Sequence, residues 1–108
     1  MQRRYSEYTI HELQKEISDL TEKAQKAEQM GMVNEFAVYQ RKIVMAKSYA
    51  MDPRRFKNKE TYEIQGAPGE YLKIRYMNGI FAWGKRLDKE GNVLNEEEAL
   101  PIALLIEE

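Results

Sequence analysis

The sequence predicts an α+β fold in which an antiparallel helical hairpin, residues 6–52, precedes a small, partly open antiparallel β-barrel, residues 61–108. In the first half, apolar residues recur every three or four positions, which is typical of amphipathic helices. In the second half, apolar and polar residues alternate, and glycine and asparagine separate the runs. A chain of 108 residues has room for one shared core, so we expect a single domain in which residues 53–60 form a basic connector.

The first predicted helix begins after Thr9, because Thr9 and Glu12 have the spacing of a capping box. In that motif each side chain accepts a hydrogen bond from a backbone N–H that the helix leaves unpaired. Gly31 is placed to end the helix, since glycine adopts the left-handed backbone conformation at little cost. The stripe expected to face a partner helix comprises Ile10, Leu13, Ile17, Leu20, Ala24 and Ala27.

The second predicted helix has Asn34 as its N-cap, with Val33 and Val38 packed around it as a hydrophobic staple. It ends before Pro53, because a residue that precedes proline is pushed out of the helical region. Its apolar stripe comprises Phe36, Tyr39, Ile43, Ala46 and Ala50. Since only a short turn separates the two helices, we expect them to pack as antiparallel neighbours.

Three alternating runs, residues 61–65, 70–77 and 80–87, predict β-strands. Asn78-Gly79 lies between the second and third runs and is a strong signal for a β-hairpin with positive φ at both residues. With these two residues as the turn, Met77 pairs with Ile80, and the side chains divide between two faces. The face expected in the core holds Leu72, Ile74, Tyr76, Phe81, Trp83 and Leu87, with Lys85 as an exception. The opposite face holds Tyr71, Lys73, Arg75 and Arg86.

The C-terminal residues allow two interpretations. Val93-Leu94 begins a strand, and Asn95–Ala99 then forms either one turn of helix or extended chain, while Pro101 prevents a longer helix. Ile102–Ile106 has the composition of a last buried strand. Five short antiparallel strands of this kind favour a small, partly open barrel of the SH3-like type.

The composition favours a binding module over an enzyme. The absence of cysteine excludes thiolate chemistry, and the one histidine, His11, has no nucleophile at a matching spacing. We therefore expect no catalytic residue, no metal site and no cofactor. The N-terminus lacks the apolar segment of a secretory signal, and no apolar run is long enough to span a membrane, so we expect a cytoplasmic protein with no membrane partner.

Charge is distributed unevenly, although the net charge is only −1. Residues 51–92 carry nine basic and six acidic side chains, whereas residues 93–108 carry five glutamates and no basic side chain. A basic face that also carries an aromatic ring can contact phosphates and stack a base. The hypothesis of nucleic-acid binding names Arg54, Arg55, Lys73, Arg75 and Arg86 as phosphate contacts and Tyr71 as the stacking surface.

An alternative hypothesis gives the helical hairpin the functional role. Methionine adapts to irregular apolar surfaces and is common where proteins bind other proteins. Those methionines and tyrosines that do not pack in the core would form a protein-binding surface or a homodimer contact. The candidates, all on or near the hairpin and each with core packing as its alternative role, are Met30, Met32, Tyr39, Met45, Tyr49 and Met51.

Two segments carry a family resemblance. The run Ala27–Glu35 with the following Ala37-Val38-Tyr39, and the later run Asn78–Gly84, resemble the YfhH-like family of Bacillus-type bacteria, and the similarity extends over nearly the whole chain. The resemblance implies a helical hairpin followed by an SH3-like barrel. It implies no particular activity, and some members carry a provisional label as transcriptional regulators. It supplies no site residues.

Overall fold

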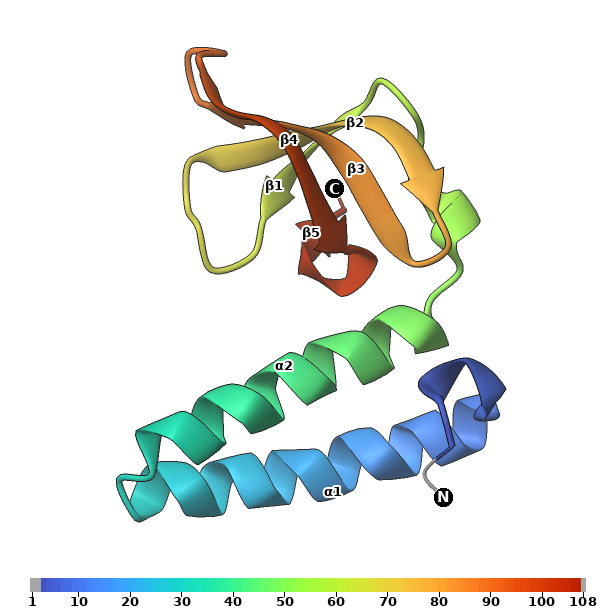
Figure 1. Ribbon diagram of the computed structural model, residues 1–108, viewed down its shortest axis with the longest axis vertical. Helices are drawn as coiled ribbons and strands as arrows, with labels where there is room; N and C mark the ends of the chain where they lie inside the picture. Colours follow the sequence, from blue (N-terminus) through green and yellow to red (C-terminus); the bar gives the residue numbers. More distant parts are fainter. Residues whose placement is uncertain (1–2, 108) are drawn as a thin grey trace. The chain divides into compact units, whose positions relative to one another are not determined.

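The computed structural model describes residues 3–107 and has the expected α+β architecture, two helices followed by a five-stranded antiparallel sheet (Figure 1). The chain divides between residues 51 and 52 into two compact units. The first contains the helices and the second contains the sheet, and each is described by itself below.

Helix α1 spans Ile10–Gln29 and begins and ends as the sequence predicts. The Thr9 hydroxyl accepts from the backbone N–H of Glu12 at 3.1 Å, and the Glu12 carboxylate accepts from the N–H of Thr9 at 3.0 Å, so the capping box is complete. At the other end Gly31 has a φ of 71°, and the N–H of Met32 donates to the carbonyl of Ala27 at 2.8 Å. These features close the helix with a Schellman motif.

Helix α2 spans Val33–Ala50 and starts differently from the prediction. Met32 occupies the N-cap position, with no side-chain cap, and Asn34 lies inside the first turn. The predicted staple is wrong, because Val33 is 75% and Val38 is 43% exposed. The Schellman motif explains the difference: it brings the chain into the second helix immediately after Gly31, which leaves no room for a separate capping residue.

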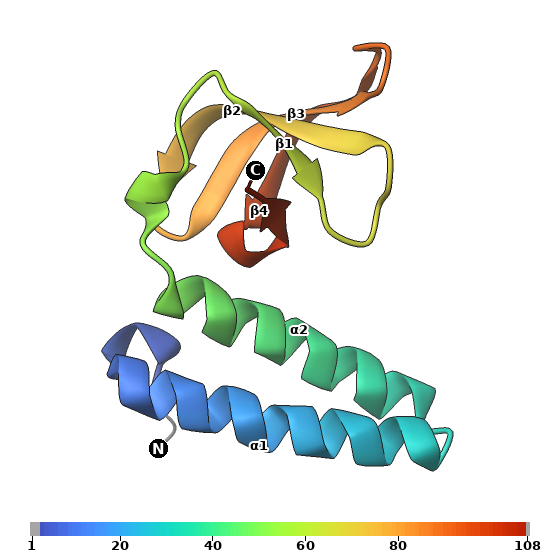
Figure 2. The same ribbon diagram turned by 180° about the vertical axis from the view of Figure 1, so that it is seen from behind.

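The two helices lie side by side and antiparallel in both views (Figures 1 and 2). Their shared core is built from the predicted stripes, with Leu20, Ala24 and Ile43 buried and with Ile17, Phe36 and Tyr39 packed against them. The small Ala24 lets the second helix approach closely. Ile10, at the start of the predicted stripe, is 53% exposed and does not belong to this core.

The second unit is a curled antiparallel sheet with the strand order β4-β3-β2-β1-β5 (Figure 2). The strands are β1 (Thr61–Ile64), β2 (Glu70–Asn78), β3 (Phe81–Asp88), β4 (Val93–Pro101) and β5 (Leu105–Ile106). Leu72, Ile74 and Ile102 are almost completely buried. Phe56, the apolar residue of the connector, is 3% exposed and meets the ring of Tyr62 edge-on at 5.2 Å.

The C-terminal segment resolves the ambiguity of the sequence in favour of strand. Asn95–Ala99 is extended within β4, where Asn95, Glu98 and Ala99 pair with β3 and a register shift lies between Asn95 and Glu98. The prediction of one strand over Ile102–Ile106 is wrong: Ile102–Leu104 forms a 3₁₀ turn, and only Leu105 and Ile106 pair with β1. The turn redirects the chain from the β4 edge of the sheet to the β1 edge.

The β2–β3 hairpin has a different register from the one that the sequence predicts. Asn78 pairs with Phe81, so the two turn residues are Gly79 and Ile80 rather than Asn78 and Gly79. Gly79 has a φ of 59°, whereas neither Asn78 nor Ile80 has a positive φ. Glycine at the first central position with an ordinary residue at the second is the pattern of a type II′ turn, not of the expected type I′ turn.

A β-bulge then shifts the register a second time. Ile74 pairs with Gly84 and Tyr76 pairs with Trp83, which leaves Arg75 as an extra residue on β2. Because an inserted residue changes which face every later side chain occupies, the predicted core face is correct for Leu72 and Ile74 and wrong beyond them. Tyr76 is accordingly 39% exposed.

Candidate nucleic-acid interface

One face of the β2–β3 hairpin carries cations and aromatic rings together; we call it the outer face. Its members are Tyr71, Lys73, Arg75, Tyr76, Trp83 and Lys85. Lys73 and Lys85 are direct cross-strand partners, and both are exposed. Like charges directly opposite one another on a sheet are destabilising, so this pair is not explained by the stability of the fold.

The register places an aromatic pair next to the lysines. The rings of Tyr76 and Trp83 are parallel to within 5°, and their centroids are 5.8 Å apart. The Arg75 guanidinium carbon lies 5.5 Å from the centroid of the Tyr76 ring. The bulge produces this arrangement, because it turns Arg75 and Tyr76 toward the same strand partner.

Strand β4 brings acidic side chains to the edge of the outer face. Arg75 forms an ion pair with Glu97, and the Lys85 ammonium lies 3.8 Å from a carboxylate oxygen of Glu96. Within residues 3–107, Lys73 has no carboxylate at salt-bridge distance. Arg75 and Lys85 remain 61% and 51% exposed, so these pairs are weak and leave the cations accessible to other anions.

Arg86 does not belong to the outer face, which corrects the sequence prediction. Its cross-strand partner is the fully buried Leu72, so its side chain lies on the core side of the sheet. There the guanidinium donates to Glu98 at 2.8 Å and to Glu70 at 2.9 Å. The hydrogen bonds that Arg86 donates to Glu98 and, to a smaller extent, to Glu70 raise the pKa of the guanidinium. With both partners in place and its side chain only 21% exposed, Arg86 is a structural cation.

The two connector arginines are not brought to the outer face either. Arg54 is held by Asp52, with distances of 2.8 to 3.2 Å to both carboxylate oxygens. Arg55 pairs at 2.7 Å with Glu107, which follows β5 at the opposite edge of the sheet from β4. Of the six residues predicted from the sequence, the structure groups Tyr71, Lys73 and Arg75.

Three residues of the outer face were missed by reasoning from the sequence: Tyr76, Trp83 and Lys85. The expected register assigned all three to the core. The signal that could have found them was the position of Lys85, the only charged residue on that predicted face. The observed register, with its shifted turn and one inserted residue, places Lys85 opposite Lys73 and removes the anomaly.

Gly84 allows β2 and β3 to approach closely beneath these residues. A Cβ atom built on Gly84 would lie 1.9 Å from the carbonyl oxygen of Lys73, far inside contact distance. No residue other than glycine fits there without moving the strands apart. The outer face therefore depends on this glycine for its geometry.

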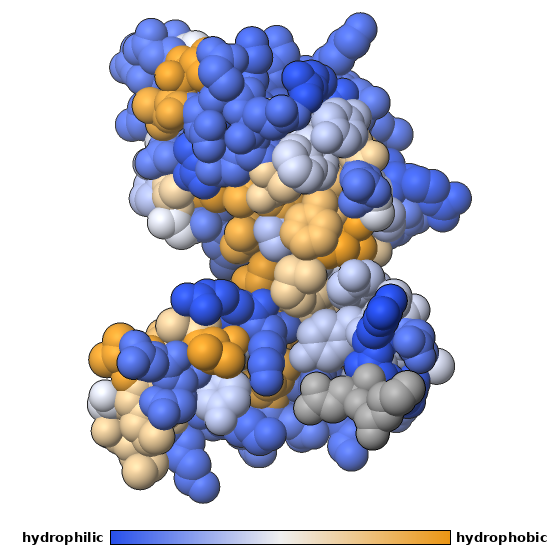
Figure 3. Space-filling view, viewed as in Figure 1, coloured by the Kyte–Doolittle hydropathy of each residue, from blue (hydrophilic) through white to orange (hydrophobic). Residues whose placement is uncertain are grey.

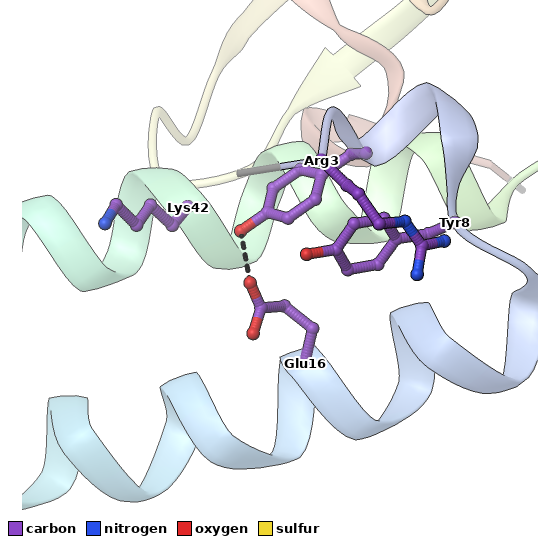
Figure 4. A pocket seen from close by; sticks show the side chains of 5 residues that line it. Arg3, Tyr8, Glu16 and Lys42 are labelled. Carbon is purple, nitrogen blue, oxygen red and sulfur yellow. Dashed lines mark hydrogen bonds between the residues drawn. The ribbon is translucent and has the colours of Figure 1, made fainter. Parts of the chain in front are cut away.

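A separate hollow of about 340 Å³ lies in the helical unit, lined by Arg3, Tyr5, Tyr8, Glu16 and Lys42 (Figure 4). The Tyr5 hydroxyl donates to Glu16 at 3.0 Å, while the Lys42 ammonium is turned away from this pair. Burial, together with that bond, raises the pKa of Tyr5 to about 12. The polar contacts within the hollow join the N-terminal segment to α1, so we interpret it as structural.

Arg3 secures the same segment through two carboxylate contacts. Its guanidinium donates to both oxygens of Glu12, at 2.6 and 2.8 Å, and lies 4.7 Å over the ring of Tyr8. The hydrogen bond from Arg3, followed by the one from the Thr9 N–H, lowers the pKa of Glu12 to about 2. The capping box and the N-terminal segment therefore share one carboxylate.

The turn end of the helical hairpin exposes apolar side chains. Met30 is 69%, Val33 is 75% and Met32 is 38% exposed, and Figure 3 shows apolar surface gathered at this end of the helices. A shallow depression of about 140 Å³ adjoins them and is bordered by Lys23, Lys26 and Glu35. We call this region the hairpin tip.

Two further features bear on the class of protein. No helix within residues 3–107 is long and apolar enough to cross a membrane. The same residues contain no group of three or more histidine, cysteine or acidic side chains arranged to hold a metal ion.

Comparison with known proteins identifies the family. A family model described as "Protein of unknown function (DUF1811)" matches residues 3–106. The chain belongs to this family. It is 49% identical over 107 residues to a Bacillus subtilis (strain 168) protein named "Uncharacterized protein YfhH", and the match covers 99% of this chain and 98% of the relative. The family resemblance recognised in the sequence is thereby confirmed, and neither description states an activity.

Proposed function

We propose that this protein is a non-catalytic nucleic-acid-binding module whose outer face contacts phosphate groups. The observation that supports this best is the Lys73–Lys85 pair: two exposed lysines are direct cross-strand partners, and Lys73 has no acidic partner within residues 3–107. A phosphate placed between them would remove their repulsion and gain two ion pairs. Arg75, beside them, would supply a third contact.

We further propose that the protein acts in the cytoplasm, in a regulatory rather than a catalytic role. The provisional label that the resemblance suggests, transcriptional regulator, agrees with binding to nucleic acid without chemistry. The assignment of the sheet to the SH3-like type is part of the same proposal, and it is supported by five short strands that curl into a partly open sheet.

The expected binding is weak and depends strongly on salt. Three phosphate contacts give a slope of about −2 to −3 in a plot of log K against log salt concentration. Binding of this kind, which does not depend on base sequence, has a Kd of roughly 10⁻⁴ to 10⁻⁶ M at physiological salt. The low net charge gives no general attraction, so any affinity must come from the outer face.

Fluorescence anisotropy with labelled oligonucleotides at several salt concentrations tests the proposal. The double variant Lys73→Glu, Lys85→Glu should lose measurable binding, because two attractive contacts become repulsive. The matched control is Lys15→Glu, Lys47→Glu, which changes the net charge by the same amount on exposed positions of the helices. Equal weakening by both pairs, or no binding by the wild type at low salt, contradicts the proposal.

A second candidate function is self-association through the hairpin tip, with a second copy of this chain as the partner. The specific observation is the exposed apolar group Met30, Met32 and Val33. Its border carries both signs of charge, Lys23 and Lys26 against Glu35. A surface that carries both charges is complementary to itself about a two-fold axis, which brings each lysine of one copy near a glutamate of the other.

Light scattering coupled to size-exclusion chromatography tests this second candidate. A dimer should form at high protein concentration and should be lost in Val33→Glu, while Gln14→Glu, an exposed control on α1, should keep it. A monomeric mass at all concentrations, or a dimer that survives Val33→Glu, argues against the hairpin tip.

A further inference from the structure

We infer that the outer face selects single-stranded nucleic acid, because Tyr76 and Trp83 form a platform on which an unpaired base stacks. This inference rests on the proposed function and adds the class of ligand to it. Base stacking on aromatic rings stabilises single-strand complexes without regard to base identity, since every base has a π-face. In a duplex the faces of the bases are already covered by their neighbours, so the platform has little to bind.

The position of the platform relative to the lysines supports the inference. Lys85 lies two residues from Trp83 on β3, and strands rise about 3.3 Å per residue, so the backbone positions of the two residues are roughly 7 Å apart along the strand. One nucleotide can span this separation, with its base on the rings and a phosphate between Lys73 and Lys85. The Arg75 guanidinium lies over the Tyr76 ring, so a base that stacks on this ring shares its face with Arg75 or displaces the guanidinium.

The acidic border of the outer face disfavours a duplex. Glu96 and Glu97 come from β4, the strand adjacent to β3 on the side away from β2. A single strand that follows Lys73 and Lys85 meets these carboxylates only at the long, exposed contact between Lys85 and Glu96, which a phosphate would replace. A duplex has a second phosphate backbone, which would lie over β4 and be repelled there.

Trp83 is the only tryptophan in the chain, so its intrinsic fluorescence reports directly on the platform. We would titrate the wild-type protein with single-stranded DNA, single-stranded RNA and duplex DNA of the same sequence at low salt. Single strands of both kinds should quench the fluorescence, and the duplex should not. Equal quenching by the duplex would overturn the inference.

Variants of Tyr76 separate stacking from simple charge attraction. Tyr76→Ala should weaken single-strand binding by about 5- to 150-fold, the equivalent of ~1–3 kcal/mol. Tyr76→Phe keeps the ring and should bind as the wild type does, and Tyr71→Ala, at the far end of the outer face, should have a smaller effect. Circular dichroism and urea melts show whether each variant is folded. Should Tyr76→Ala fail to fold, the wild-type quenching and Tyr76→Phe still decide the question.

The outcomes distinguish this inference from the proposed function. The proposed function stands and the platform is overturned if three results occur together. The Lys73/Lys85 double variant loses binding, the wild type binds single and double strands equally, and Tyr76→Ala has no effect. No binding of any oligonucleotide overturns both. Single-strand preference together with quenching and the Tyr76 effect supports both.

Discussion

Two neighbouring cross-strand pairs in the β2–β3 hairpin use positive charge in opposite ways. Leu72–Arg86 faces the core, and its arginine bonds to two carboxylates. Lys73–Lys85, one step along, faces solvent and sets two cations against each other. The difference shows that a basic residue is available to bind an external anion only when the protein has not already neutralised it. The predictions below test this contrast, from the largest expected effect to the smallest.

The strand register that separates the two pairs depends on Gly84. Gly84→Ala should destabilise the protein by about 3 kcal/mol or more, because its Cβ would overlap the backbone of Lys73. Gly66→Ala is the control: its site is open but has a φ of 83°, so only about 1 kcal/mol of backbone strain is expected. Urea melts that give equal midpoints for both variants would show that the register, and the outer face with it, is wrong.

Removing the paired arginine should cost stability. Arg86→Met leaves Glu70 and Glu98 without their shared partner on a partly buried face, for which we expect a loss of about 1–3 kcal/mol. The same variant should leave oligonucleotide binding unchanged at temperatures where it is folded. A melt identical to that of the wild type would mean that Arg86 is not a structural cation.

Removing the unpaired Lys73 should have the opposite effects: stability should hardly change, and oligonucleotide binding should weaken. Lys73→Met should change stability by no more than about 0.5 kcal/mol, and any change should be toward greater stability, because it removes the repulsion from Lys85. Oligonucleotide affinity should fall. A double-mutant cycle with Lys85→Met measures the repulsion itself, and a favourable coupling between the two lysines would contradict the structure.

The smallest effect concerns an exposed carboxylate that is nonetheless paired, Glu12. Its pKa is lowered from 4.5 to about 2 in the folded protein, so its contribution to stability is complete above pH 4.5 and is lost as the pH falls toward 2. The difference in unfolding midpoint between the wild type and Glu12→Gln should therefore be largest at neutral pH. It should shrink and disappear as the pH falls from 4.5 to 2. A difference that stays constant down to pH 2 would show that the Arg3 contact does not stabilise the ionised form.

Local signals in the sequence were sufficient for α1 and for the helical core, but not for the start of α2. Thr9 and Glu12 fix the start of α1 and Gly31 fixes its end, because capping geometry involves residues only a few positions apart. The stripe residues Leu20 and Ile43 reach the core for the same reason, since helical periodicity is set within the helix itself.

The sheet could be predicted only in outline. The strand positions follow from alternation, but two single-residue choices decide which face each side chain occupies. One is whether Asn78 or Gly79 opens the turn, and the other is the insertion of Arg75. Neither choice has a local signature, because both depend on how well the completed sheet packs. The aromatic platform, which exists only in the bulged register, was therefore assigned to the core.

The acidic run of β4 has a consequence for the protein's solubility. β4 is an edge strand, and such a strand can pair with the edge of another molecule and begin aggregation. Exposed Val93 and Leu94 add to that risk, whereas the glutamates at 96–98 oppose it, because a second copy pairing there would set like charges together. An engineer who neutralised Glu96 and Glu97 to tighten phosphate binding would also remove this protection, and the protein would gain affinity at the cost of a greater tendency to form fibres.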